Sequence, residues 1–191
     1  GDYQLTVDRE LGEVTLHAEA TSLETIRREL DRVKNYPYDC NEQMASKVKV
    51  LLAKKRLSQR LGEDFKEDRQ IKSLLNKLCK NQNQEGLWGW WNNQSSVFWI
   101  SQQVLSALLD AEEAGYRLKI DKELVSATLQ RQVDQALNDL HLVGHRPLPL
   151  AKRELLEHLM TLKRLNATID YADYFRSIDG ELKSRTSADK L

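Results

Sequence analysis

The spacing of apolar residues changes early in the chain. Val14, Leu16 and Ala18 alternate with polar residues, which is typical of a β-strand with one buried face. Residues 4–7 are a shorter candidate strand that would pair with it. Further along, apolar residues recur every three or four positions, which indicates amphipathic helices. We therefore expect a short β-strand pair within residues 1–20, followed by a helical region.

Seven helices are expected after the strand pair, and capping or breaking residues mark several of their ends. Gly62 is predicted to end the second helix, Ser95 or Ser96 to cap the fourth, and Asp121 to cap the fifth. The fourth helix has apolar residues on two faces, so it should be buried between neighbours. The helices are predicted near residues 21–35, 40–61 and 68–80, then around 100–111, 125–140, 155–165 and 171–182.

Consecutive amphipathic helices joined by short loops predict an all-α array of helical hairpins. The chain has 191 residues, which suffice for one domain with a sizeable core, and we assign residues 21–191 to it. Residues 1–20 are interpreted as the end of a neighbouring β domain or as a strand on which one docks. The sequence thus predicts a piece of a larger protein.

Charge and composition narrow the classes of function. Lys plus Arg and Asp plus Glu both number 29, so no basic field would attract nucleic acid. No apolar run is long enough to span a bilayer, and no signal peptide opens the chain. Phosphate-loop, paired-cysteine zinc and His-Glu-x-x-His motifs are missing, so no cofactor or metal is predicted. Cys40 and Cys79 do not make a disulfide framework, and Cys79 lies beside an apolar helical stripe.

A boundary between loop and helix falls just before Cys40. Pro37 disfavours helix at the preceding residue. Asp39 and Glu42 are spaced like a capping box, which places Cys40 at the first helical position.

Cys40 and Gln43 are three residues apart, and residues at that spacing share one face of a helix. The sulfur and the carboxamide could therefore meet and condense into an internal thioester, with loss of ammonia. A helix N-terminus favours the thiolate that this chemistry needs. The spacing alone has little specificity, because most Cys-x-x-Gln pairs are a plain thiol and a plain amide.

The surrounding residues add specificity. The segment Tyr36-Pro37-Tyr38-Asp39-Cys40-Asn41-Glu42-Gln43 resembles the Pro-Tyr-Gly-Cys-x-Glu-Gln thioester signature of the alpha-macroglobulin and complement family. Asp39 stands where that signature usually has Gly, and Asn41 fills a slot that varies among bacterial members. Further on, Gly86-Leu87-Trp88-Gly89-Trp90-Trp91 and the later Ala-Glu-Glu-Ala-Gly-Tyr helix end are similar to segments of bacterial members, in the same order.

This resemblance implies the thioester domain of a bacterial-type alpha-2-macroglobulin, a broad-spectrum protease inhibitor. The domain would be the N-terminal part of an α/α toroid, with Cys40 and Gln43 forming the thioester. In such a trap, a lysine of the attacking protease displaces the thiol and becomes covalently attached, once and without turnover, so the chain is not an enzyme. The resemblance also implies a periplasmic, cell-surface or secreted location and no insertion of this piece into the membrane.

A thioester must be shielded from water and small amines until it is needed. Tyr36 and Tyr38 are the nearest candidates for this role, and the loop that carries Trp88, Trp90 and Trp91 is a more distant one. Complement-type members also use a downstream histidine to direct transfer to hydroxyls. None of the three downstream histidines lies in a matching motif, so amines are the expected targets; these residues are His141, His145 and His158.

Two other functions stay open. The tryptophan-rich loop could stack against sugar rings in a polysaccharide-binding or polysaccharide-processing module, since α/α toroids also serve in such enzymes. A hydrolase would need two carboxylates across a cleft, and the available ones are Glu42, Glu85, Asp110 and Glu112. The third interpretation is a helical interaction domain in which Cys40 and Gln43 are inert.

Overall fold

The computed structural model describes residues 22–142 and 152–178. These residues are mainly helical, which confirms the all-α class, and the described part contains no β-strand. The predicted strand pair lies outside the described residues, and the α/α toroid stays a prediction. Residues 171–178 are helical too, after six longer helices: α1 (Leu23–Lys34), α2 (Asn41–Leu61), α3 (Asp68–Lys80), α4 (Phe98–Glu113), α5 (Lys122–Leu142) and α6 (Lys152–Arg164).

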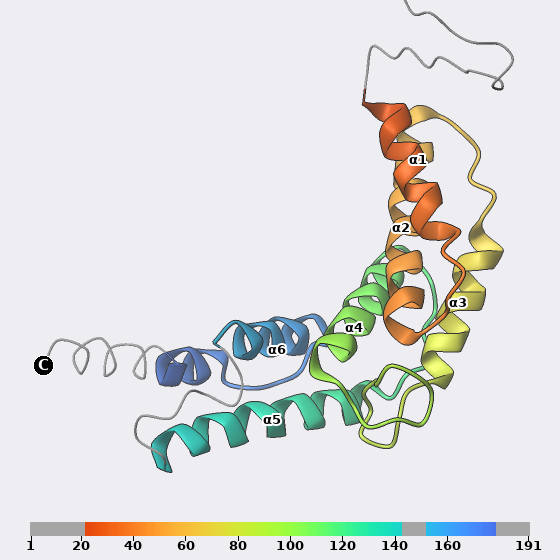
Figure 1. The fold of residues 1–191 in the computed structure, drawn as a ribbon. Helices are drawn as coiled ribbons and strands as arrows, with labels where there is room; N and C mark the ends of the chain where they lie inside the picture. The colour runs from red at the N-terminus through yellow and green to blue at the C-terminus, as the bar shows by residue number, and fades with distance from the viewer. Residues whose placement is uncertain (1–21, 143–151, 179–191) are drawn as a thin grey trace, which may run out of the picture.

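The helices form two groups that meet at α4 (Figure 1). In one group α2 packs against α1 and α3, and in the other α5 packs against α6. Helix α4 contacts both α2 and α6, so it lies between the groups. Its two apolar faces are buried as expected, because each faces a different neighbour; the buried apolar residues are Ile100, Val104, Leu105, Ala107, Leu108, Leu109 and Ala111.

Local signals account for several helix ends. Gly62 follows α2 with a φ of 68°, a left-handed conformation that glycine adopts without steric cost, so the predicted stop is confirmed. Asp121 caps α5 by accepting a hydrogen bond from the Leu124 N–H at 2.9 Å, also as predicted. The predicted cap of α4 is wrong, because Val97 occupies the N-cap position and the Ser96 hydroxyl donates to Glu85 instead.

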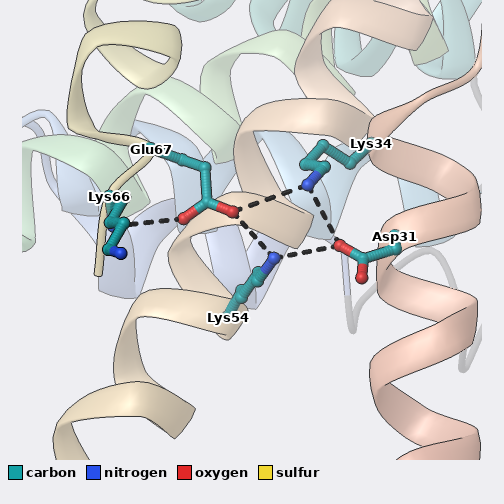
Figure 2. Close-up of polar contacts among 5 residues, drawn as sticks. All are labelled: Asp31, Lys34, Lys54, Lys66 and Glu67. Carbon is teal, nitrogen blue, oxygen red and sulfur yellow. Dashed lines mark hydrogen bonds and ion pairs between the residues drawn. The ribbon is translucent and has the colours of Figure 1, made fainter. Parts of the chain in front are cut away.

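An ion network ties α1, α2 and the start of α3 together (Figure 2). We call it the Asp31 network: Asp31, Lys34, Lys54 and Glu67. The Lys54 ammonium lies 3.0 Å from Asp31 and 2.7 Å from Glu67, and Lys34 lies 3.1 Å and 3.5 Å from the same two carboxylates. Each lysine therefore has two carboxylate partners. Helix α1 has no fully buried residue, so the network adds ionic contacts to its packing against α2.

Candidate functional site

Cys40 and Gln43 face each other at the start of α2. Cys40 is the N-cap residue with extended backbone (φ −68°, ψ 165°), and only 2% of its surface is exposed. The Gln43 side-chain oxygen accepts a hydrogen bond from the Cys40 N–H at 3.2 Å, and the two residues form a capping box. The Gln43 carboxamide therefore folds back onto the backbone of Cys40, and its meeting with the Cys40 sulfur stays a prediction.

The predicted capping box was displaced by one residue. We expected Asp39 to cap the helix with Glu42, and Cys40 to be the first helical residue. Instead Cys40 is the cap, and Glu42 accepts a hydrogen bond from the Ser46 hydroxyl at 3.0 Å. Asp39 has other partners because two lysines approach its carboxylate.

Asp39, the residue at the signature's usual glycine position, is held by Lys47 of α2 and Lys77 of α3. The Lys47 ammonium donates to Asp39 Oδ1 at 2.6 Å and to the Tyr38 carbonyl at 2.9 Å, and the Lys77 ammonium donates to Asp39 Oδ2 at 2.9 Å. Lys47 is buried, whereas Lys77 is exposed. The two ammonium groups, chiefly Lys47, hold the pKa of Asp39 below its usual range. We call this cluster the Asp39 clamp: Asp39, Lys47, Lys77 and the Tyr38 carbonyl.

Asn41 joins the start of α2 to the tryptophan loop (residues 81–96). Its side chain is fully buried and donates to the Gly89 carbonyl at 3.0 Å, while its oxygen accepts from the Asn81 amide at 2.7 Å. Its backbone N–H donates to the Trp90 carbonyl at 2.9 Å. The loop that seemed distant in sequence thus contacts the residue next to Cys40.

Trp88 anchors this loop in the core. The indole is fully buried and donates to the Leu78 carbonyl at 2.7 Å. The Ser101 hydroxyl accepts from the Trp88 N–H at 3.0 Å and donates to its carbonyl at 2.8 Å, which fixes the loop on α4. Gly89 must be glycine, because an added Cβ would lie 2.4 Å from the Ser95 carbonyl oxygen.

The other aromatic residues near the site are exposed. Trp90 packs edge-to-face against Trp99 at 5.2 Å between ring centres, yet both indoles and that of Trp91 are about half exposed. Tyr36 and Tyr38 contact each other at 5.6 Å and are 47% and 61% exposed. Both precede the buried Cys40 in the chain and are not buried themselves, so their shielding role stays a prediction. Pro37 between them is exposed as well.

Among the downstream histidines, only His158 has a described side chain. It is buried in α6, where Nδ1 lies 2.7 Å from the Glu154 carbonyl and Nε2 lies 2.9 Å from Gln132 Oε1. Phe98 stacks on its ring at 4.7 Å, and burial lowers the pKa of His158. These contacts explain His158 as a core residue. His145 and the side chain of His141 lie outside the part of the chain that the structure describes.

The four carboxylates considered for sugar hydrolysis have separate partners. Glu85 accepts from the Ser96 hydroxyl, Asp110 pairs with Arg164 at 2.7 Å, and Glu112 pairs with Lys122 at 2.7 Å. Glu42 is bonded to Ser46, as described above. Each is thus engaged in a local contact of its own.

Comparison with protein-family models, with curated proteins and with solved structures found no match to this chain. In the part of the chain that the structure describes, no helix is both long and apolar enough to cross a membrane. Among the same residues, no group of three or more His, Cys, Asp or Glu side chains is placed to hold a metal ion.

Two contributors to this site were missed by sequence reasoning, Lys47 and Asn81. Asn41 was predicted as part of the signature, but its contacts with Gly89 and Asn81 were not. One signal for Lys47 was available: this charged residue lies between Met44 and Val48 in the apolar part of α2, and a buried lysine needs a partner.

Proposed function

We propose that this chain is the thioester domain of a bacterial-type alpha-2-macroglobulin, a protease trap that acylates its target. The observation that carries the proposal is the pairing of a buried Cys40 with a Gln43 side chain folded back onto it. The helical hairpins would be the N-terminal part of an α/α toroid. Residues 1–20 would connect to a neighbouring β domain of the same, larger protein.

The chemistry joins the side chains of two residues that already form a capping box. The Cys40 sulfur attacks the Gln43 carboxamide carbon, the carbon–nitrogen bond breaks, and ammonia leaves. The product is an activated acyl group, which an amine can later attack while the Cys40 thiol departs. Cys40 lies at the N-terminus of α2, the end of a helix where the dipole stabilises negative charge.

The proposed trap works once. A protease would cleave a bait segment elsewhere in the larger protein, and the resulting rearrangement would expose the thioester. A lysine of the protease then attacks the Gln43 acyl carbon and stays attached through an amide. This is inhibition by covalent capture and not catalytic turnover, in a periplasmic, cell-surface or secreted setting.

Reaction with methylamine tests this function. The intact native protein should take up one methylamine at Gln43 and gain a titratable Cys40 thiol. It should also form adducts with a target protease that survive denaturation. Cys40→Ala and Gln43→Glu should take up no methylamine and form no adducts. An untreated wild-type protein with a free Cys40 thiol and no uptake would refute the trap.

The alternative is a polysaccharide-binding module, and one observation favours it: Trp90, Trp91 and Trp99 present half-exposed indoles near one another and could stack on sugar rings. Catalysis of sugar hydrolysis has less support, because the candidate carboxylates are engaged separately. Quenching of tryptophan fluorescence by oligosaccharides, lost in Trp99→Ala, would be the positive result for this alternative.

A further inference from the structure

The Lys47 amine and the Gln43 carboxamide both bond to the residues just before α2. Lys47 is four residues after Gln43 on α2, so the two side chains are neighbours on one helical face, with Cβ atoms about 5–6 Å apart. Both side chains also point back toward the helix start. Gln43 reaches the Cys40 N–H at 3.2 Å, and Lys47 reaches the Tyr38 carbonyl at 2.9 Å.

A free amine in this position would threaten a thioester. Nearness of the reacting groups makes an internal attack far faster than attack by an amine in solution. An ammonium ion has no lone pair and cannot attack. The stability of a Cys40–Gln43 thioester would therefore depend on keeping Lys47 protonated and turned toward its partners.

Asp39 is the group that holds Lys47 in this position. It is the one carboxylate paired with Lys47 in the described structure, at 2.6 Å, and its other oxygen is held by Lys77. Lys47 is only 6% exposed, so without Asp39 its charge would be buried with no carboxylate partner. Asp39, at the usual glycine position of the signature, thus has a specific partner in this chain.

We propose that Asp39 guards the thioester by holding Lys47 as an ammonium ion, and that Lys47 is an internal acceptor for the Gln43 acyl group once this contact is lost. The inference rests on the proposed thioester. In the internal reaction the Lys47 nitrogen bonds to the Gln43 acyl carbon and the carbon–sulfur bond breaks. Cys40 leaves as a thiolate, which takes up the proton released by the amine. The product is a Gln43–Lys47 amide cross-link within α2.

The Gln43–Lys47 cross-link can be distinguished from the thioester by its thiol and its reaction with methylamine, but not by its mass. Both the thioester and the cross-link have lost one ammonia, so their masses are equal. They differ in the Cys40 thiol, which is blocked in the thioester and free in the cross-linked form. They also differ toward methylamine, because an ordinary amide does not react with it.

The test uses Asp39→Asn, which keeps the size of the side chain and removes its charge. We expect this variant to keep the lower mass, expose the Cys40 thiol, take up no methylamine and yield a peptide that joins Gln43 to Lys47. The double variant Asp39→Asn with Lys47→Met removes both charges together and should recover methylamine uptake. Asp31→Asn, which also removes a carboxylate shared by two lysines, should react like the wild type.

Two results would contradict the proposed role of Asp39 without contradicting the proposed thioester. One is an Asp39→Asn protein whose Cys40 stays blocked and whose Gln43 still takes up methylamine. The other is loss of the thioester in Asp39→Asn without a Gln43–Lys47 peptide and without recovery in the double variant. Failure of the trap itself looks different, because the untreated wild type would then have its full sequence mass and a free Cys40 thiol.

Discussion

The Asp31 network and the Asp39 clamp each contain one aspartate shared by two lysines. They differ in whether the lysines have a second carboxylate partner. In the Asp31 network both lysines also reach Glu67 (Figure 2), so each keeps a carboxylate if Asp31 is removed. In the Asp39 clamp Lys47 pairs with Asp39 and otherwise with the Tyr38 carbonyl. The first arrangement is typical of structural reinforcement, whereas the second makes one buried ammonium depend on one carboxylate.

The positions of the clusters differ as well. Lys54 lies about 20 Å further along α2 than Cys40, at a rise of about 1.5 Å per residue. Lys47 lies one turn after Gln43. Both aspartates have a lowered pKa because of their lysines, chiefly Lys54 for Asp31 and Lys47 for Asp39. Similar electrostatics can thus support packing along α2 and, as we propose, protect a reactive bond at its start.

Trp88→Ala should have the largest effect on stability, and it should affect the start of α2 more than the surroundings of Lys54. Loss of this fully buried side chain should lower the free energy of unfolding by about 3–5 kcal/mol. It should also release the loop from Asn41, so amide hydrogen exchange should accelerate at the start of α2 more than around Lys54. Urea unfolding and hydrogen exchange measure both quantities. Equal acceleration at the two ends of α2 would contradict a separate role for the loop.

A smaller effect is expected from Asn41→Ala. This change leaves the buried Gly89 carbonyl and the Asn81 amide without their partner, which should cost about 1–3 kcal/mol of unfolding free energy. The measurement is again urea unfolding. Methylamine uptake before any protease is added should become faster, since the loop beside Cys40 is no longer pinned. An unchanged uptake rate would show that the loop does not limit access.

The smallest expected effect is the difference in unfolding free energy between Asp31→Asn and Asp39→Asn. Asp31→Asn should cost less than about 1 kcal/mol, because the pair is partly exposed and Glu67 remains. Asp39→Asn should cost more, because buried Lys47 loses its carboxylate. Both aspartates have a lowered pKa, so their contribution is present above about pH 4 and disappears as acid protonates them.

Urea unfolding at pH 7 and at pH 3 checks this order. Each variant should differ less from the wild type at pH 3 than at pH 7, since protonation removes the same charge from the wild type. A larger cost for Asp31→Asn than for Asp39→Asn at pH 7 would reverse the proposed contrast between the clusters.

Sequence reasoning succeeded where the signal is local. Gly62 ends α2 and Asp121 caps α5 because both effects act within a few residues. The apolar stripe of α3 is buried as its spacing indicates, and so are the two faces of α4. The bond from the Cys40 N–H to the Gln43 side chain is local as well, since it lies within one helical turn.

The rest of the site depends on contacts between distant parts of the chain. Asn41 meets Gly89 across 48 residues, and Asp39 meets Lys77 across 38. Periodicity carries no information on such pairs. The displaced capping box has the same cause: Asp39 is a better helix cap than cysteine in isolation, but Lys47 and Lys77 occupy its carboxylate.

The central claim is the bond between Cys40 and Gln43, and the intact mass of untreated native protein together with its thiol count tests it most directly. Cys79 provides an internal reference, because it is a free and half-buried thiol on the same chain. We expect a mass lower than the sequence mass by one ammonia and one reactive thiol after rapid unfolding, with a second thiol appearing after methylamine treatment. The full sequence mass with two reactive thiols in the untreated protein would contradict the account.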